Sequence, residues 1–177
     1  MIRYFLSAAY LGSIAFSISA AAAESSAIDS HKGGMKITTA DVKNLAKEFV
    51  RNLSGQFALD PMKKEQIGNY QVPVIQNGDW ILTDHPLPLV ASFSARTNAI
   101  ATIFVKVEEE FIVVSTSLPS SAPVLDHNTP AYKDLNDGKR YTGEVQLLGK
   151  NYMADFNPFR DKDGRVIGAY LIGIPLY

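Results

Sequence analysis

The sequence predicts an α+β domain in which one amphipathic helix precedes a meandering antiparallel sheet. Two observations support this prediction. Apolar residues between Val42 and Leu53 recur at the spacing of a single buried helical face. In the second half of the chain, short segments rich in β-branched and aromatic residues alternate with turn residues, as in a sheet linked by hairpins.

The first 23 residues have the pattern of a secretory signal peptide. Arg3 precedes a run from Tyr4 to Ala20 without charged side chains, and Ala21-Ala22-Ala23 precedes Glu24. We therefore expect cleavage after Ala23 and a periplasmic or secreted protein. The alternative is an uncleaved membrane anchor, because the run is nearly long enough to span a bilayer. Its hydrophobicity is diluted, however, by Ser7, Gly12, Ser13, Ser17 and Ser19.

Removal of the signal peptide leaves 154 of the 177 residues, which is the size of one domain with a substantial hydrophobic core. The whole chain has a formal net charge of −1, and loss of Arg3 makes it −2, which argues against nucleic-acid binding. There is no cysteine, so the fold depends on its core and not on disulfides. No second apolar run reaches membrane-spanning length, and we expect the mature protein to be soluble.

The mature chain is expected to begin with a flexible arm and to continue as a single domain. Residues 24–36 are polar and lack a hydrophobic period, which is typical of an unstructured segment. The domain then occupies residues 37–177. Thr39 is the expected N-cap of its first helix, which ends near Ser54-Gly55.

Turn signals divide the remainder of the chain. Asp60-Pro61 has the chemistry of a short helical turn that continues through Lys64. Asn77-Gly78 and Asp163-Gly164 indicate tight turns, and the second is expected to be a two-residue turn with positive φ at both central residues. Trp80 is expected in the core. The predicted strands are Val90–Phe93, Ile100–Val107, Phe111–Ser117, Gly143–Leu148, Tyr152–Phe159 and Arg165–Ile172.

Two connections between these strands also have recognisable patterns. Glu108-Glu109-Glu110 is expected at a solvated hairpin tip, since three adjacent carboxylates at a turn are more typical of an exposed surface than of a metal site. Pro130–Leu135, with Thr129 ahead as N-cap, is expected to form a short helix that crosses between strands.

An ordered set of short motifs extends along most of the domain. Its members are Val72-Pro73-Val74-Ile75, Asn77-Gly78, Ala101-Thr102-Ile103-Phe104-Val105, Val114-Ser115-Thr116, Leu125-Asp126, Pro130-Ala131-Tyr132, Gly138-Lys139, Tyr141-Thr142-Gly143, Gly149-Lys150-Asn151-Tyr152, Asn157-Pro158, Asp163-Gly164, Val166-Ile167-Gly168 and Ile172-Gly173. In order and spacing, this set resembles the single Cache domain, the PAS-like extracellular sensor domain of bacterial chemoreceptors and sensor kinases. The resemblance covers about residues 40–174.

The resemblance implies a long N-terminal helix packed on a five- or six-stranded antiparallel sheet. It also implies non-covalent binding of a small molecule, often a short-chain carboxylate, between the sheet and its covering loops. The sequence contains no second membrane helix and no cytoplasmic domain, so we expect a separate membrane receptor or sensor kinase to receive the signal. Related chains often carry two arginines and a tyrosine where this sequence has Lys106, Val113 and Phe156.

A carboxylate in a partly dry cleft needs a cation and directed hydrogen-bond donors. The candidate ligand-binding residues that supply these groups are Lys106, Thr116, Tyr141, Lys150 and Tyr152. Strand alternation places Lys106 on the same face as Phe104, and Lys150 on the same face as Tyr152. The alternative is that the lysines extend into solvent along the sheet surface and the tyrosines pack with their hydroxyl groups at its rim.

Enzymatic patterns are absent from the sequence. His31, His85 and His127 are scattered and lack the spacing of a zinc site, and there is neither a Gly-x-Ser-x-Gly elbow nor a cysteine. Asp161-Lys162-Asp163-Gly164 resembles the start of a calcium loop, but the later ligands of such a loop are missing. We therefore expect no catalytic activity, no metal and no cofactor.

The sequence as a whole predicts an exported small-molecule sensor that acts with a separate membrane signalling protein. The alternative is an envelope protein-interaction module with a vestigial pocket.

Intact-mass analysis of protein from the envelope fraction tests the signal peptide. The expected mass is that of residues 24–177, because the small residues before Glu24 suit signal peptidase. A mass that includes residues 1–23, found in the membrane pellet, would instead indicate an anchored protein.

Overall fold

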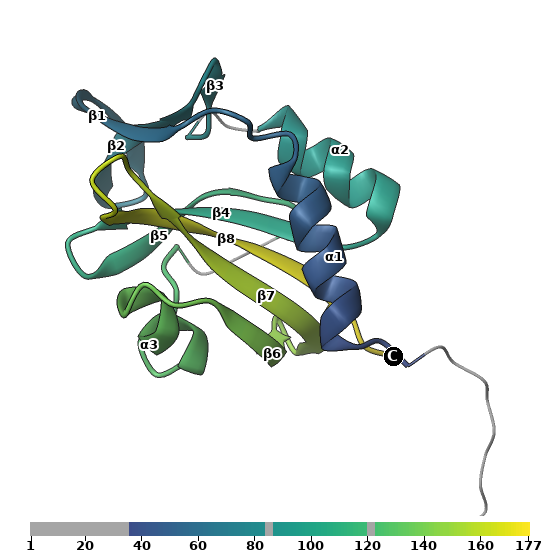
Figure 1. Cartoon of the computed structure of the whole chain (residues 1–177). Coiled ribbons are helices and arrows are strands. Elements are labelled where there is room, and N and C mark those ends of the chain that lie inside the picture. The colour runs from purple at the N-terminus through teal and green to yellow at the C-terminus, as the bar shows by residue number, and fades with distance from the viewer. Residues whose placement is uncertain (1–35, 84–86, 120–122) are drawn as a thin grey trace, which may run out of the picture. The chain divides into compact units, whose positions relative to one another are not determined.

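The computed structural model describes residues 36–83, 87–119 and 123–177, and Figure 1 shows their arrangement. The expected signal peptide and the arm, apart from Lys36, lie outside these residues, as do His31 and His85. The helices are α1 (Thr39–Val50), α2 (Pro88–Thr97) and α3 (Pro130–Asn136). The strands are β1 (Phe57–Ile67), β2 (Tyr70–Asn77), β3 (Trp80–Ile81), β4 (Ile100–Val107), β5 (Glu110–Thr116), β6 (Tyr141–Leu147), β7 (Lys150–Arg160) and β8 (Val166–Pro175).

Helix α1 confirms the predicted amphipathic helix, although its N-cap is Thr38 and not Thr39. The Thr38 hydroxyl accepts a hydrogen bond from the backbone N–H of Asp41 at 3.4 Å, and the Asp41 carboxylate accepts one from the N–H of Thr38 at 2.8 Å. This capping box fixes the start of the helix. The helix has twelve residues, so the longer N-terminal helix implied by the resemblance is not shown.

Five antiparallel strands form the main sheet in the order β5-β4-β8-β7-β6. They correspond to the five strands predicted beyond residue 100, with ends that differ by a few residues. Glu108 and Glu109 lie at the tip between β4 and β5, as expected. Helix α3 also matches its prediction, because the Thr129 hydroxyl accepts a hydrogen bond from the N–H of Tyr132 at 3.1 Å.

The strands β1, β2 and β3 form a separate antiparallel sheet. The helical turn predicted at Asp60-Pro61 is wrong, since these residues lie within β1 at a register shift between Asp60 and Lys64. The Asp60 carboxylate accepts hydrogen bonds from the N–H groups of Met62 and Lys63, at 3.1 and 3.3 Å. Asp60 therefore makes the contacts of a helix cap, but it does so in a β-bulge.

The strand predicted at Val90–Phe93 is also wrong, because these residues lie in α2. Pro88 occupies the first turn of this helix, and Asn98 ends it in the left-handed conformation with φ of 57°. The helix buries Leu89, Val90 and Phe93. An apolar run this short fits a buried strand or a buried helix equally well, so periodicity alone did not distinguish them.

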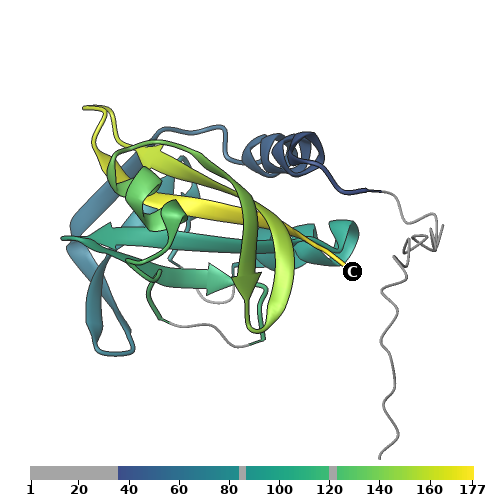
Figure 2. The same ribbon diagram turned by 90° about the horizontal axis from the view of Figure 1, so that it is seen from below.

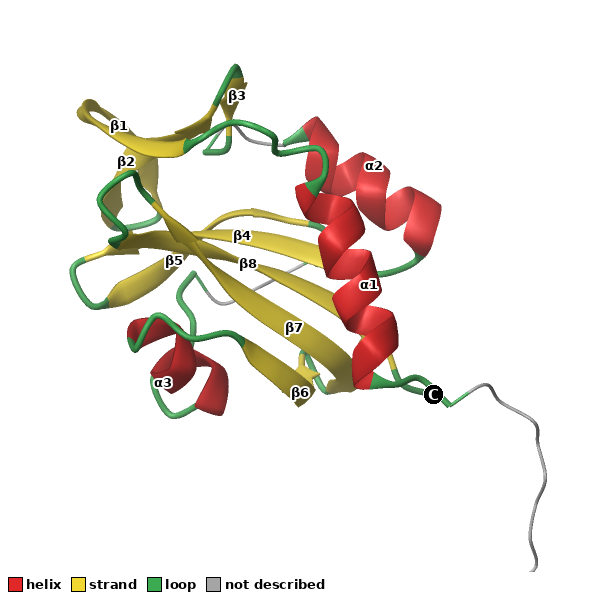
Figure 3. Cartoon of the chain, viewed as in Figure 1, coloured by secondary structure: helices red, strands yellow, loops and turns green. Residues whose placement is uncertain are grey.

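Strand alternation gives the main sheet two faces with different cores. On the first face, α1 and α2 pack against residues that include Ile103, Met153 and Tyr170. On the second face, α3 packs against residues that include Phe104 and Phe156. Figure 3 shows α1 and α2 beside each other and α3 apart from them, and Figure 2 shows the same elements from below.

Trp80 does not lie in the core, contrary to expectation. It belongs to the two-residue edge strand β3 and is 41% exposed. Asn77, which pairs with Trp80 between β2 and β3, is fully buried instead. The side-chain amide of Asn77 donates a hydrogen bond to the carbonyl oxygen of Gly55 at 2.5 Å. None of the helices within the described ranges is both long and apolar enough to span a bilayer.

The Asp163-Gly164 turn is present but differs from the predicted two-residue type. Gly164 has φ of 80°, whereas Asp163 has no positive φ. The N–H of Gly164 donates to the carbonyl oxygen of Asp161 at 3.0 Å. The N–H of Asp161 donates to the carbonyl oxygen of Arg165, also at 3.0 Å. The loop is therefore longer than predicted, and one left-handed residue closes it.

Gly164→Val should lower the free energy of unfolding by about 1–3 kcal/mol. No atom lies within 4 Å of a Cβ built at Gly164, so the cost arises from backbone strain at positive φ and not from a clash. Gly164→Asn is the control, because asparagine tolerates this conformation better and should cost less. Equal denaturant midpoints for the parent and the valine variant would contradict this account.

Candidate functional site on the second face of the sheet

Two neighbouring cavities lie on the second face, between the sheet and the segment that leads into α3. Their volumes are about 210 and 260 Å³. Leu125, Thr129, Gln146, Leu147 and Phe156 line both cavities. The covering segment is fixed to the edge of β5, since the N–H of Val113 donates to the carbonyl oxygen of Pro123 at 2.8 Å and the N–H of Leu125 donates to that of Phe111 at 3.0 Å.

Two hydroxyl groups give the smaller cavity a polar feature. Thr102 lines this cavity and is 2% exposed, and its oxygen lies 2.7 Å from the hydroxyl oxygen of Thr116. The N–H of Leu118 donates to the same Thr116 oxygen at 3.1 Å. When Thr116 donates to Thr102, the hydroxyl hydrogen of Thr102 remains available to a polar ligand atom in the cavity.

The charge of the lining is neutral or negative. The described residues that line the two cavities include no Lys, Arg or His, whereas Asp126 and Glu144 are among them. Val113 and Phe156, which replace an expected arginine and tyrosine, both line the smaller cavity. A carboxylate ligand would therefore lose its hydration here without gaining a cation.

One of the sequence-predicted site residues lines these cavities, and a second is bonded to a residue that does. Tyr141 lines the larger one, and its ring packs edge-on against Phe156 with centroids 6.1 Å apart. Its hydroxyl donates to the carbonyl oxygen of Glu144 at 3.4 Å. Thr116 does not line the smaller cavity, but its hydroxyl group is hydrogen-bonded to that of Thr102, which does.

Lys106 lies on the second face but does not line either cavity. Its ammonium group donates to the Asn136 side-chain oxygen at 2.7 Å and lies 5.6 Å from the centroid of the Phe111 ring. These contacts connect β4 with the end of α3. Lys106 would have to leave both of them to reach a ligand.

Lys150 and Tyr152 lie together elsewhere. They line a surface cavity of about 540 Å³ that also includes Ser94 and Asn98 near the end of α2, and Leu176. Tyr152 is 6% exposed. The structure thus separates the five predicted residues into three places.

Sequence reasoning missed several of the residues that line both cavities, above all Gln146 and Leu147. Leu125 was noted as part of a motif, without a role in the site. Alternation along β6 was the available signal, but a strand at the sheet edge gives no indication of which loop covers it.

The first face contains a buried carboxylate that holds an arginine. Asp155 is fully buried and accepts two hydrogen bonds from Arg140, at 2.6 and 2.8 Å, and one from the Thr142 hydroxyl at 2.7 Å. Asn157 donates to the same carboxylate. Burial and the charge of Asp155 raise the pKa of Tyr170 to about 12, although Arg140 acts in the opposite direction.

Comparison with known families gives the class of this protein. A family model for the Cache 3/Cache 2 fusion domain matches residues 20–176. The chain belongs to this family. Cache domains are extracellular or periplasmic sensory domains that bind small molecules and are not enzymes. No curated protein matches the sequence.

Stability should fall between pH 10 and pH 12 because of Tyr170. Its pKa in the folded state exceeds the ordinary value of 10.0, so its contribution is complete below pH 10 and is lost as the pH rises through about 12. A difference of two units corresponds to about 2.7 kcal/mol. Denaturant titrations across this range should show a smaller decline for Tyr170→Phe than for the parent.

Tyr177→Phe is the matched control, because Tyr177 is fully exposed. It should reproduce the decline of the parent. The same decline in Tyr170→Phe as in the parent would show that other groups cause the alkaline loss.

Proposed function

We propose that this chain is an exported sensor domain that binds a small metabolite in the two cavities of the second face. The observation that carries the proposal is the position of these cavities between the main sheet and the segment that covers it. The small volumes favour a compact ligand. We further propose that a separate membrane receptor or sensor kinase reads the bound state.

The charge of the lining supports an uncharged or positively charged ligand for these cavities. Phe104, Tyr141 and Phe156 offer aromatic surface, and Asp126 offers a carboxylate. Glu144 also borders the larger cavity, but it pairs with Met153 and its side chain therefore lies on the first face. Aromatic faces attract cations and pack well against apolar groups. A short carboxylate, which the resemblance implies, is better placed at a site that contains a lysine.

A thermal-shift screen tests the proposal. Matched sets of an amine, an alcohol and a carboxylate with the same carbon skeleton should show stabilisation by the amine or the alcohol. A ligand that binds only the folded state adds about 2.7 kcal/mol at 100 times its Kd. Leu147→Trp should remove the shift, because Leu147 lines both cavities, its side chain packs on the second face and indole is much larger.

Gln71→Trp is the control for this variant, since Gln71 is an exposed strand residue on β2 and lines neither cavity. It should keep the shift of the parent. A carboxylate whose binding depends on Lys106, Lys150 or Tyr152, and is unaffected by Leu147→Trp, would overturn the assignment. Absence of any shift across the screen would favour the alternative, an envelope interaction module with a vestigial pocket.

A further inference from the structure

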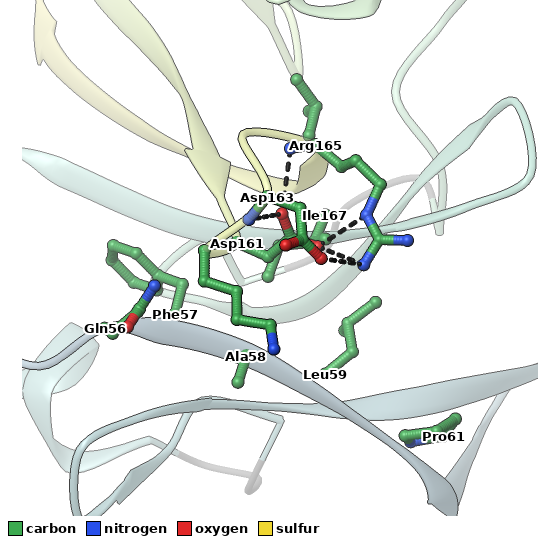
Figure 4. A pocket seen from close by; sticks show the side chains of 11 residues that line it. Gln56, Phe57, Ala58, Leu59, Pro61, Asp161, Asp163, Arg165 and Ile167 are labelled. Atoms are coloured by element: carbon green, nitrogen blue, oxygen red, sulfur yellow. Dashed lines mark hydrogen bonds and ion pairs between the residues drawn. The ribbon is translucent and has the colours of Figure 1, made fainter.

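A cavity of about 560 Å³ lies between β1 and the turn that joins β7 to β8 (Figure 4). In the part of the chain that the structure describes, β1 has β2 as its only neighbouring strand, so its other edge is free. Residues 161–163 and 165–167 form the facing wall. The cavity shares no lining residue with the two cavities of the second face.

The lining residues of β1 show that the cavity follows the edge of this strand. Gln56, Phe57, Ala58 and Leu59 all line it. Phe57 and Leu59 pack against the core of the first face. Gln56 and Ala58 are exposed. A cavity over one face of a strand meets alternate residues, because successive side chains point to opposite faces. The consecutive lining residues therefore place the backbone of β1 along the cavity.

The outward backbone groups at this edge have no partner among the described residues. Residues 57–60 pair with β2 in regular register. No backbone hydrogen bond within the described ranges joins residues 56–60 to a segment other than β2. In an antiparallel pair, alternate residues direct their N–H and C=O groups away from the neighbouring strand. An extended chain is the ligand that matches such a row of donors and acceptors.

The free edge is short. A register shift follows between Asp60 and Lys64, and Pro61 within it has no N–H group. Bulges and prolines protect strand edges against unwanted pairing. The unprotected part is therefore residues 57–60, which extends over about 13 Å. It suits a segment with about four paired residues.

The walls favour apolar side chains at alternate positions of such a segment. Phe57 and Leu59 line the cavity from β1, and Ile167 lines it from β8. The Phe57 ring is stacked on Phe159 with centroids 4.2 Å apart, which holds this wall in place. Apolar side chains that enter between these residues lose contact with water, and this favours binding.

The charges at the rim cancel. The Arg165 guanidinium donates to Asp161 at 2.8 Å and to Asp163 at 3.1 Å, and Figure 4 shows this group beside the cavity. Lys162 is the second cation at the rim, so two carboxylates face two cations. A charged segment would find no net opposite charge here, and an uncharged segment is the complementary one.

The facing wall also limits where the segment can come from. A strand within a folded sheet has another strand beside it, and the β7–β8 turn occupies that space here. The β1 strand of a second copy would meet this obstacle. A segment without neighbouring strands, such as a terminus or a long loop of another protein, does not.

We propose that this groove binds an extended, uncharged segment of a partner protein, which adds to the small sheet beside β1. Its backbone bonds to the outward groups of residues 57–60. Its apolar side chains lie against Phe57, Leu59 and Ile167, and the alternate polar side chains face solvent. This interaction goes beyond the proposed sensor function and does not depend on the ligand of the second face.

Isothermal titration calorimetry with a blocked hexapeptide of alternating valine and threonine tests the mode of binding. Two further versions carry N-methyl groups, one on the valine nitrogens and the other on the threonine nitrogens. Only one of these sets faces β1, so one version should bind at least about tenfold more weakly than the parent peptide and the other about equally. Equal binding of the two versions, or no binding of the parent peptide, would overturn the proposal.

Amide hydrogen exchange measured by NMR tests the place and the occupant. The peptide should slow exchange at alternate residues between Gln56 and Asp60, because their outward N–H groups become bonded. Binding without this protection would overturn the proposal. Protection in the free mature chain would assign the groove to its own N-terminal arm, and protection that rises with protein concentration would assign it to a second copy. Either result would overturn the choice of a partner protein.

Matched variants on one strand complete the test. Leu59→Gln should weaken peptide binding at least about tenfold, because it removes apolar contact from the groove. Ile67→Gln is its control, since Ile67 is also a partly buried residue of β1 that packs against the same core but does not line the cavity. Circular dichroism and the thermal midpoint establish that both are folded. Equal binding by the two variants would overturn the proposal.

The charge of the segment and the independence of the two sites have their own controls. Peptides with lysine or with glutamate in place of threonine should not bind more tightly than the uncharged peptide, and a gain of about tenfold with either would overturn the choice of an uncharged segment. Leu147→Trp should bind the peptide like the parent, because Leu147 does not line this cavity. Failure of the peptide experiments thus leaves the ligand proposal for the second face unaffected.

Discussion

A continuous series of aromatic contacts holds the elements of this domain together. Phe93 of α2 packs edge-on against Phe49 of α1 at 5.1 Å, and Phe49 contacts Tyr170 of β8 at 5.7 Å. Tyr170 contacts Phe159 of β7 at 5.4 Å, and Phe159 stacks on Phe57 of β1 at 4.2 Å. Each pair adds about 0.5–1.5 kcal/mol beyond the burial of its area. Five elements that are distant in the sequence are thereby joined across the first face.

The packing of these aromatic residues also explains where the cavities of the domain lie. The first face is filled by two helices and large rings, whereas the second face is covered by α3, which has seven residues and buries only Ala131 and Leu135. The two small cavities lie beside that short helix. The cavity of about 560 Å³ lies next to the last aromatic pair, where β1 faces the β7–β8 turn.

The distribution of charge follows from the same packing. Arg140 is bound to the fully buried Asp155, and removal of one partner from such a pair typically costs about 3–5 kcal/mol. Arg140 therefore serves the fold and is not available to a ligand. Lys106 is held by Asn136, so the second face is left without a cation at its cavities among the described residues.

The sequence by itself determined the elements whose signals are local. Short segments rich in β-branched and aromatic residues, bounded by turn residues, predicted β4 to β8; the spacing of apolar residues predicted α1, and Thr129 with Pro130 predicted α3. Local signals failed where the same residues suit two different kinds of secondary structure. Asp60-Pro61 suits a helix start as well as a β-bulge, and Val90–Phe93 suits a strand as well as the helix α2. Only the pairing with β2 and the packing on β4 decided these cases.

The residues of the candidate site depended on the tertiary structure much more than the helices and strands did. The sequence correctly supplied a family and placed Lys106 on a strand, whereas Tyr141 lay two residues before the predicted strand Gly143–Leu148 and in fact begins β6. It gave no indication that Lys106 would extend to Asn136, or that Lys150 and Tyr152 would line a different cavity. A cavity is formed by side chains from strands and covering segments that are distant in the sequence. Its position and charge are therefore set by strand order and by the covering segment, which local patterns do not encode.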